Sequence, residues 1–248
     1  MPDVTGYRSK VAVIVPSTNT VVEHDLAAMR PHGVTFHTGR MYISDPALDS
    51  DEAAEALLLQ IRASMSTAIR DVMTAKPDLM MMGMSAETFW GGVEGNAAFI
   101  ERVRAMSDGL TVSTGASACR AALEAMGVRR ISVFSPYQPV ADVNVGRYFA
   151  EAGFDVVRIT GLRAPSATAI AEITPEEIKR VIEEIDTPET EAIVQVGTNL
   201  SMVGLTDTLE HWLGKPVIAI NAATMWHCLR AGGINDTWGG FGSLLRDF

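Results

Sequence analysis

Residues 11–20 read VAVIVPSTNT, a run of five apolar residues that ends at Pro16 and passes into four polar residues. A short apolar run rich in β-branched residues is typical of a strand that is buried on both faces. The polar residues are turn formers and helix caps, and a helical pattern then continues to Arg30. The stretch therefore predicts a strand, a loop and a helix, in that order.

A second stretch of the chain has the same form. Residues 131–137 read ISVFSPY, an apolar run closed by a serine and a proline, and a helical pattern follows over residues 140–152. The order of strand, polar loop and helix is therefore repeated, and the two segments resemble copies of one unit.

The likeness continues beyond each first helix. A second apolar run begins at Gly33 and again at Gly153, and each leads through a loop into an amphipathic pattern, over residues 53–74 and 174–185. These patterns predict a second strand and a long helix in each half of the chain.

A third pair of apolar runs then follows, DLMMMGMS over residues 78–85 and EAIVQVGT over residues 191–198. Each run is a strand of the buried type that breaks at a small polar residue. The alignment of the two halves places Met84 and Gly197 at matching positions, one at the end of each strand.

Strands that alternate with helices predict parallel sheets joined by crossover helices. The predicted fold class is α/β, with two pseudo-symmetric, doubly wound lobes, and we expect the active site between the lobes. Residues 1–112 with 216–248 are assigned to the first lobe, because residues 216–220 and 222–231 add a strand and a helix that complete it. Residues 113–215 are assigned to the second lobe.

Ligands bind at the carboxyl ends of the strands in such sheets. Any one of the loops there is an ordinary turn or helix cap by itself. Four of them together favour one cleft, and these are residues 17–20, 84–88, 135–137 and 197–200.

Composition limits the classes of ligand. The formal net charge is -10 and the basic residues form no cluster, which argues against nucleic acid as a partner. The N-terminus lacks the apolar core of a signal peptide and no apolar run is long enough to span a membrane, so we expect a cytoplasmic protein. Cys119 and Cys228 stand alone in expected helices, and no spacing indicates a metal site or a dinucleotide cofactor. We expect neither a metal nor an organic cofactor.

Several short motifs, in a consistent order, resemble one enzyme superfamily. They are residues 16–20 with Glu23, residues 83–92, residues 135–137, residues 198–200, and residues 214–217 with Trp226 and His227. Together they resemble the maleate cis-trans isomerases and arylmalonate decarboxylases of the aspartate/glutamate racemase superfamily, over nearly the whole chain. The resemblance implies a small carboxylate-containing substrate, catalysis without a cofactor, and a possible homo-oligomer.

In that superfamily each lobe usually supplies one cysteine. The resemblance places the first at Met84 and the second, which is also the cysteine of arylmalonate decarboxylases, at Gly197. Neither Met nor Gly can act as a nucleophile or as an acid/base. We therefore expect both thiols to be replaced, and chemistry that uses either of them to be excluded.

Polar residues at the same loops are retained. The resemblance implies that Asn19, Tyr137, Thr198 and Asn199 hold a carboxylate, and amide and hydroxyl donors at helix starts can bind an anion without a basic residue. The same side chains also suit helix capping. We expect one pocket surrounded by Ser17, Asn19, Met84, Ser85, Glu87, Tyr137, Gly197, Thr198 and Asn199.

Three further residues are candidates for chemistry. Ser85 stands in a sequence close to the G-x-S-x-G nucleophile elbow, but Glu87 replaces the second glycine, so Ser85 is either a nucleophile or a hydrogen-bond donor. Glu87 is a candidate general acid/base, or a favourable charge in the first turn of a helix. The resemblance makes His227 a candidate base and substrate-binding residue, whereas a helical histidine beside Trp226 is also typical of a packed structural residue. Asp25 and Asp142 lie near expected helix starts, where the helix dipole explains them.

The resulting function hypothesis is thiol-free chemistry on a small organic acid or acid amide, by decarboxylation, elimination or hydrolysis, with Glu87, Ser85 and Tyr137 as catalytic residues. A maleate isomerase or a racemase with other acid/base groups is one alternative. A carboxylate-binding protein without catalysis is another.

Overall fold

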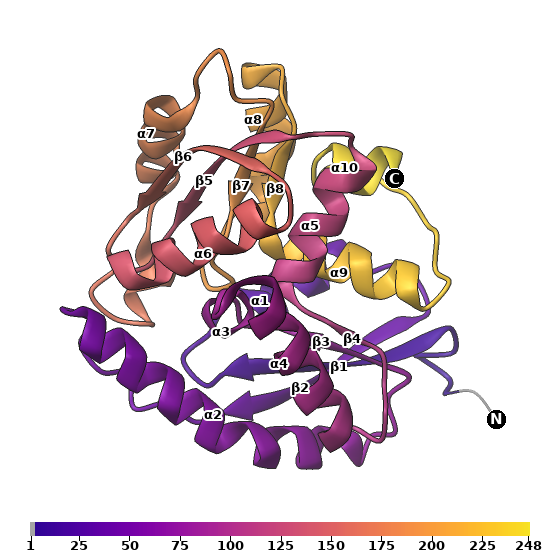
Figure 1. Ribbon diagram of the computed structural model, residues 1–248. Helices are drawn as coiled ribbons and strands as arrows, with labels where there is room; N and C mark the ends of the chain where they lie inside the picture. Colours follow the sequence, from indigo (N-terminus) through magenta and orange to yellow (C-terminus); the bar gives the residue numbers. More distant parts are fainter. Residues whose placement is uncertain (1–2) are drawn as a thin grey trace.

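The computed structural model describes residues 3–248 and contains two four-stranded parallel sheets (Figure 1). Their strand orders are β2-β1-β3-β4 and β6-β5-β7-β8, so each sheet places its second strand at one edge beside its first. Helices cover the sheets. The prediction of an α/β fold with two lobes of similar topology is confirmed.

The first lobe is built around β1, which is paired over its full length with β2 and over Val11 to Ile14 with β3. Its elements are β1 Ser9–Pro16, α1 Val22–Met29, β2 Val34–Met41, α2 Asp51–Met73, β3 Leu79–Met82, α3 Ala86–Phe89, α4 Gly92–Met106 and β4 Val112–Ser113.

The second lobe repeats this order around β5. Its elements are α5 Gly115–Ala125, β5 Arg130–Ser135, α6 Pro139–Glu151, β6 Asp155–Gly161, the 3-10 turn Ala169–Glu172, α7 Pro175–Ile185, β7 Ala192–Gln195, the 3-10 turn Val203–Leu205, α8 Thr206–Leu213 and β8 Val217–Ala219. The chain ends with α9 Ile220–Ala231 and α10 Ser243–Asp247. The expected helices over residues 53–74, 140–152 and 174–185 correspond to α2, α6 and α7 within two residues at each end.

The strand β8 differs from the sequence expectation. It pairs with β7, Ile193 opposite Val217, and is therefore the edge strand of the second sheet and does not complete the first lobe. The following helix α9 turns back and packs on α5, α1, β3 and β4. A parallel edge strand can join either sheet, and the packing of α8 against β8 places it beside β7.

The two faces of β1 belong to different apolar clusters. Ala12 and Ile14 pack with α2, whereas Val11, Val13 and Val15 belong to a cluster that continues into the second lobe. All five side chains have no exposed surface. The lobes therefore share one apolar core through α1, α5 and α9, which holds the loops at their strand ends in a fixed relation (Figure 1).

Two kinds of feature were not found among the described residues, namely a membrane-spanning helix and a metal site. Over residues 3–248, no helix combines the length and apolar character needed to cross a membrane. Within the same range, no three His, Cys, Asp or Glu side chains lie close enough together to hold a metal ion.

Candidate active site between the lobes

A pocket of about 70 Å³ lies where the carboxyl ends of β1, β3, β5 and β7 face one another. A buried water needs roughly 10 to 15 Å³ on this measure, so the pocket has room for about five water-sized groups. That is the size of a small organic acid. The loop convergence expected from the sequence is found here, since residues of all four loops line the pocket.

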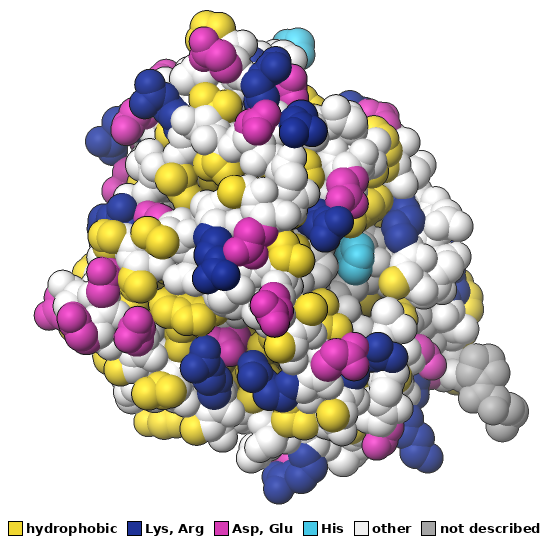
Figure 2. All heavy atoms as spheres, in the orientation of Figure 1, with side chains coloured by type: hydrophobic (Ala, Val, Ile, Leu, Met, Phe, Trp, Pro, Cys, Tyr) yellow, Lys and Arg dark blue, Asp and Glu magenta, His cyan; other side chains and the backbone are white. Residues whose placement is uncertain are grey.

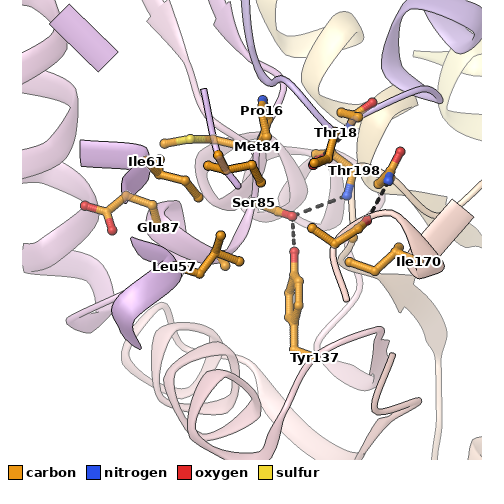
Figure 3. Close-up of a pocket in the computed structure, with 16 residues that line it drawn as sticks. Pro16, Thr18, Leu57, Ile61, Met84, Ser85, Glu87, Tyr137, Ile170 and Thr198 are labelled. Atoms are coloured by element: carbon orange, nitrogen blue, oxygen red, sulfur yellow. Dashed lines mark hydrogen bonds between the residues drawn. The ribbon is translucent and has the colours of Figure 1, made fainter. Parts of the chain in front are cut away.

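One end of the pocket is polar. Ser85, three residues after β3, and Tyr137, two residues after β5, are joined by a short hydrogen bond between their hydroxyl groups (Figure 3). The backbone N–H of Thr198, which follows β7, donates to Ser85 Oγ at 3.3 Å. Three strand ends from both lobes thus meet at one serine oxygen.

The hydroxyl groups at this end have more protons than the hydrogen bonds among the described residues use. Ser85 and Tyr137 carry one proton each, and only one of the two lies between their oxygens. The Thr198 Oγ1 accepts from the Asn19 amide at 3.4 Å, which leaves its own proton free. Burial raises the pKa of Tyr137 above its usual range, so the phenol stays neutral and is a donor. The polar end is therefore a cluster of neutral donors.

Asn19 and Asn199 hold this cluster in place. Asn19 Oδ1 accepts from the N–H groups of Val21 and Val22 at 3.0 and 2.9 Å, at the start of α1. Asn199 accepts from the N–H of Thr20 at 3.0 Å and donates to the carbonyl of Ala167 at 2.8 Å. The helix-start role and the pocket position expected for Asn19 coexist in one side chain, and Asn199 ties the two lobes together.

Apart from Thr18 and Glu87, the rest of the pocket wall is apolar. Most of its apolar side chains come from α2 and from the segments after β2, β3 and β6, and they are Ile43, Leu57, Ile61, Met84, Ala167 and Ile170 (Figure 3). Among the described residues that line the pocket, none is Lys, Arg or His. Sequence reasoning missed most of this wall, because single apolar residues on α2 carry no signal that separates them from the core.

The two strand ends differ at the positions where the sequence resemblance places cysteines. Met84 is 3% exposed and its side chain forms part of the wall. A Cβ atom on Gly197 would lie 2.5 Å from Pro136 Cδ and 2.7 Å from its Cγ. Real Cβ contacts are not this short, so the site at Gly197 accepts no side chain unless Pro136 moves.

The two cysteines of the chain lie elsewhere. Cys119 on α5 and Cys228 on α9 are buried, and neither lines the pocket. Burial raises the pKa of the Cys228 thiol to about 12 and raises that of Cys119 as well. The expectation that both are inert thiols within helices agrees with these positions.

Glu87 lies in the wall but its carboxylate points away from Ser85 and Tyr137 (Figure 3). Its Oε1 accepts from Arg62 Nε at 2.8 Å and from Arg102 at 3.1 Å. The carboxylate is 3% exposed, and the arginines are 40% and 51% exposed. Its other oxygen, Oε2, has no hydrogen-bond partner within residues 3–248, and the acid/base role expected from the sequence stays a prediction. The arginines escaped prediction because α2 and α4 bring them to Glu87 from distant positions.

Two other expected site residues lie outside the pocket. The Ser17 hydroxyl accepts from the N–H of Ile43 at 3.1 Å, while its neighbour Thr18 lines the pocket. His227 on α9 faces β4, where its Nδ1 lies 2.8 Å from Ser113 Oγ, and burial lowers its pKa. The helical register of α9 turns His227 away from the strand ends, so the packed alternative describes it.

The exposed charges are mixed in sign. On the face shown in Figure 2, basic and acidic side chains are interspersed with apolar ones over both lobes. This face therefore shows no extended basic surface.

Comparisons with known proteins identify the family of the chain. Residues 11–245 match the family model described as arylmalonate decarboxylase. A maleate isomerase of Pseudomonas putida KT2440 is 26% identical over 245 residues, which cover 95% of this chain and 96% of the relative.

Solved structures share the fold. The Nocardia farcinica maleate cis-trans isomerase bound to TRIS has a TM-score of 0.87 at 22% identity, over 96% of this chain and 97% of the other. A liganded mutant of arylmalonate decarboxylase has a TM-score of 0.81 at 20% identity, over 96% and 99%. These similar proteins are enzymes that are named for small carboxylic acids. The family model spans nearly the whole chain, and the protein therefore belongs to the arylmalonate decarboxylase family.

Proposed function

We propose that the protein decarboxylates a small acid that carries a second carboxylate and an apolar substituent, without a thiol at the reacting carbon. The observation that carries this proposal is the division of the pocket into a neutral donor cluster and an apolar wall, with no room for a side chain at Gly197.

The donor cluster suits the carboxylate that is retained. The N–H of Thr198 and the hydroxyls of Ser85, Tyr137 and Thr198 are fixed around one point by contacts from both lobes. When the carbon–carbon bond to carbon dioxide breaks, its electron pair moves to the adjacent carbon and into the retained carboxylate. The negative charge on that carboxylate then rises, and preorganised donors stabilise it.

The apolar wall suits the carboxylate that leaves. A carboxylate that faces Ile43, Leu57 and Ile61 has lost water and gains no cation in return, because none of the described lining residues is basic. Neutral carbon dioxide does not have this desolvation cost, so the wall favours its departure.

A proton must then reach the reacting carbon. Tyr137 is the phenol of the donor cluster and a neutral acid, and the hydroxyl of Ser85 is its hydrogen-bond partner. The phenol gives its proton to the carbanion, and solvent returns one through Ser85. Glu87 has no part in this step, because its carboxylate faces Arg62 and Arg102.

A maleate isomerase is the second candidate. A relative that matches nearly the whole chain bears that name, which favours it. Against it, maleate keeps both carboxylates through the reaction, whereas the pocket offers donors at one end only.

The test is a panel of alkyl- and aryl-substituted malonates, maleate, and hydroxy and amino acids in deuterated water, followed by NMR and mass spectrometry. The expected result is one equivalent of carbon dioxide from a malonate and one deuterium on the product carbon. Conversion of maleate to fumarate without loss of mass would establish the isomerase. Loss of water or ammonia would indicate elimination, and a gain of water would indicate hydrolysis.

Tight binding of an acid without turnover across the panel would instead support a ligand-binding protein. The matched control in each assay is the Tyr137→Phe variant, which keeps the ring in the pocket and removes the hydroxyl that the proposal uses.

A further inference from the structure

Asp25 on α1 is a buried carboxylate without an ion pair among the described residues. It is 1% exposed, and its Oδ2 accepts from the Asn221 side-chain amide at 2.8 Å. Its other oxygen, Oδ1, has no hydrogen-bond partner within residues 3–248. A position near the start of α1 would favour a carboxylate without burying it, so the helix dipole does not account for this environment.

The same Asn221 amide reaches the pocket. Its nitrogen also donates to the backbone carbonyl of Thr198 at 3.0 Å. The N–H of Thr198 in turn donates to Ser85 Oγ at 3.3 Å. Asp25 is therefore connected to the donor cluster through Asn221 and Thr198, although its own side chain does not line the pocket.

Gln195 at the end of β7 and Asn221 at the start of α9 hold the two peptide groups that flank the Cα of Thr198. Gln195 donates to the carbonyl of Gly197 at 2.7 Å and accepts from the N–H of Ile220 at 3.2 Å. Since the carbonyl of Gly197 and the N–H of Thr198 share one peptide plane, Gln195 restrains that N–H from one side of the Thr198 Cα. Asn221 fixes the next peptide through the carbonyl of Thr198.

The orientation of the Asn221 amide depends on its partner. An ionised carboxylate only accepts hydrogen bonds, so Asp25 requires the NH₂ group of Asn221 on its side. That orientation also presents NH₂ to the carbonyl of Thr198. A protonated Asp25 can instead donate to the Asn221 oxygen, which permits the flipped amide and places that oxygen against the carbonyl of Thr198.

Few charges surround Asp25. Burial raises its pKa to about 6, while the Asn221 contact and His24 on the same helix lower it. The helix α9, which packs against α1, carries His227 and Arg230. His227 contacts Ser113, and Arg230 contacts the carbonyls of residues 234, 236 and 248. A charged form that costs stability in this setting is typical of a functional group.

We propose that Asp25 is a positioning residue: it orients the Asn221 amide, which anchors the carbonyl of Thr198 and so, together with Gln195, restrains the backbone of Thr198, whose N–H lies in the pocket. Its protonation state is then transmitted to the donor cluster through three hydrogen bonds. The effect on turnover rests on the proposed function, whereas the orientation of Thr198 is a property of the protein without ligand.

The test uses ligand-free protein labelled with ¹⁵N-threonine, in which loss of one signal in Thr198→Ser assigns the Thr198 amide. Between pH 4.5 and 8 its chemical shift should follow a single titration with a midpoint near 6. In Asp25→Asn, which keeps the size of the side chain, the shift should be flat over this range. An unchanged titration in that variant, or a flat shift in the parent protein, would overturn the proposal.

Two further variants locate the link. In Asn221→Val, the Asp25 carboxyl carbon should still titrate but the Thr198 amide should not follow it. In His24→Gln, the matched control, the Thr198 titration should persist with a slightly raised midpoint, because His24 lowers the pKa of Asp25. Loss of the Thr198 titration in His24→Gln would assign the effect to that imidazole and contradict the proposal. Because the titration uses ligand-free protein, it can still be observed if no substrate in the panel is decarboxylated. A failure of the proposed function and a failure of this inference are therefore distinguishable.

Discussion

The ends of β3 and β7 occupy equivalent positions in the two lobes but contribute to the pocket in different ways. After β3, Met84 supplies apolar bulk and Ser85 supplies a hydroxyl. After β7, Gly197 supplies no side chain, Pro136 takes the adjoining space, and Thr198 supplies a backbone N–H. The repeated topology therefore fixes where the loops meet, whereas the chemistry depends on which strand end supplies side chains.

Each strand end is also supported by one buried carboxylate. Glu87 lies beside the end of β3 and pairs with two arginines, and Asp25 supports the end of β7 through Asn221. One carboxylate is compensated by charge and the other only by an amide. We therefore expect the two to respond differently to substitution and to pH.

The largest effect is expected where the two ends meet. Tyr137→Phe removes the hydroxyl that contacts Ser85 and should lower kcat on the decarboxylated acid by about 100- to 1,000-fold, the usual cost of losing one donor to a developing oxyanion. Steady-state kinetics with the parent and variant proteins measure this. Turnover within a few-fold of the parent rate would place the proton donor elsewhere.

The next effect tests the asymmetry directly. Gly197→Ala forces a Cβ against Pro136 and should destabilise the protein by about 1 to 3 kcal/mol, as overpacking of a close-packed site does. Met84→Leu, the matched change at the other strand end, conserves volume and should cost less than about 1.5 kcal/mol. Urea denaturation measures both values.

A double variant identifies the cause of the Gly197 effect. Pro136→Ala combined with Gly197→Ala should recover most of the stability lost at Gly197, because the colliding ring atoms are gone. Simple addition of the two single effects would show that the collision does not limit that site.

The sequence alone predicts part of this structure. The repeated strand–loop–helix pattern predicts both sheets and the meeting of four loops, because it depends on local periodicity. It does not predict that β8 joins β7, since an apolar edge strand fits either sheet. The contact between Gly197 and Pro136, and the pairing of Glu87 with Arg62, arise from packing of distant segments, which no local pattern records.

Asp25→Asn should alter stability in a pH-dependent way. The folded-state pKa of about 6 lies above the ordinary value, so the native state favours the protonated form and this contribution to stability is lost as pH rises from about 4 through 6. Near pH 4 the variant should match the parent. At pH 8 it should be more stable by about 1 to 2 kcal/mol, because one pKa unit corresponds to about 1.4 kcal/mol and local relaxation takes up part of the shift. Thermal unfolding at both pH values measures the difference, and equal stability at pH 8 would contradict it.

Glu87→Gln should have the smallest effect, although Glu87 is as buried as Asp25. Its charge is compensated by Arg62 and Arg102, but both guanidiniums are about half exposed, and such pairs usually contribute no more than about 1 kcal/mol. The variant should therefore lose about 1 kcal/mol of stability and keep kcat within about two-fold, since the carboxylate faces away from Ser85 and Tyr137.

Melting temperature and kcat measured on the same preparation distinguish a structural role of Glu87 from a role as general acid/base. A fall in kcat of about 100-fold or more would indicate a general acid/base and would make Glu87 a catalytic residue. Arg102→Gln, which removes one partner and leaves the carboxylate, is the matched control: it should share the loss of stability, and it should leave turnover unchanged in either case.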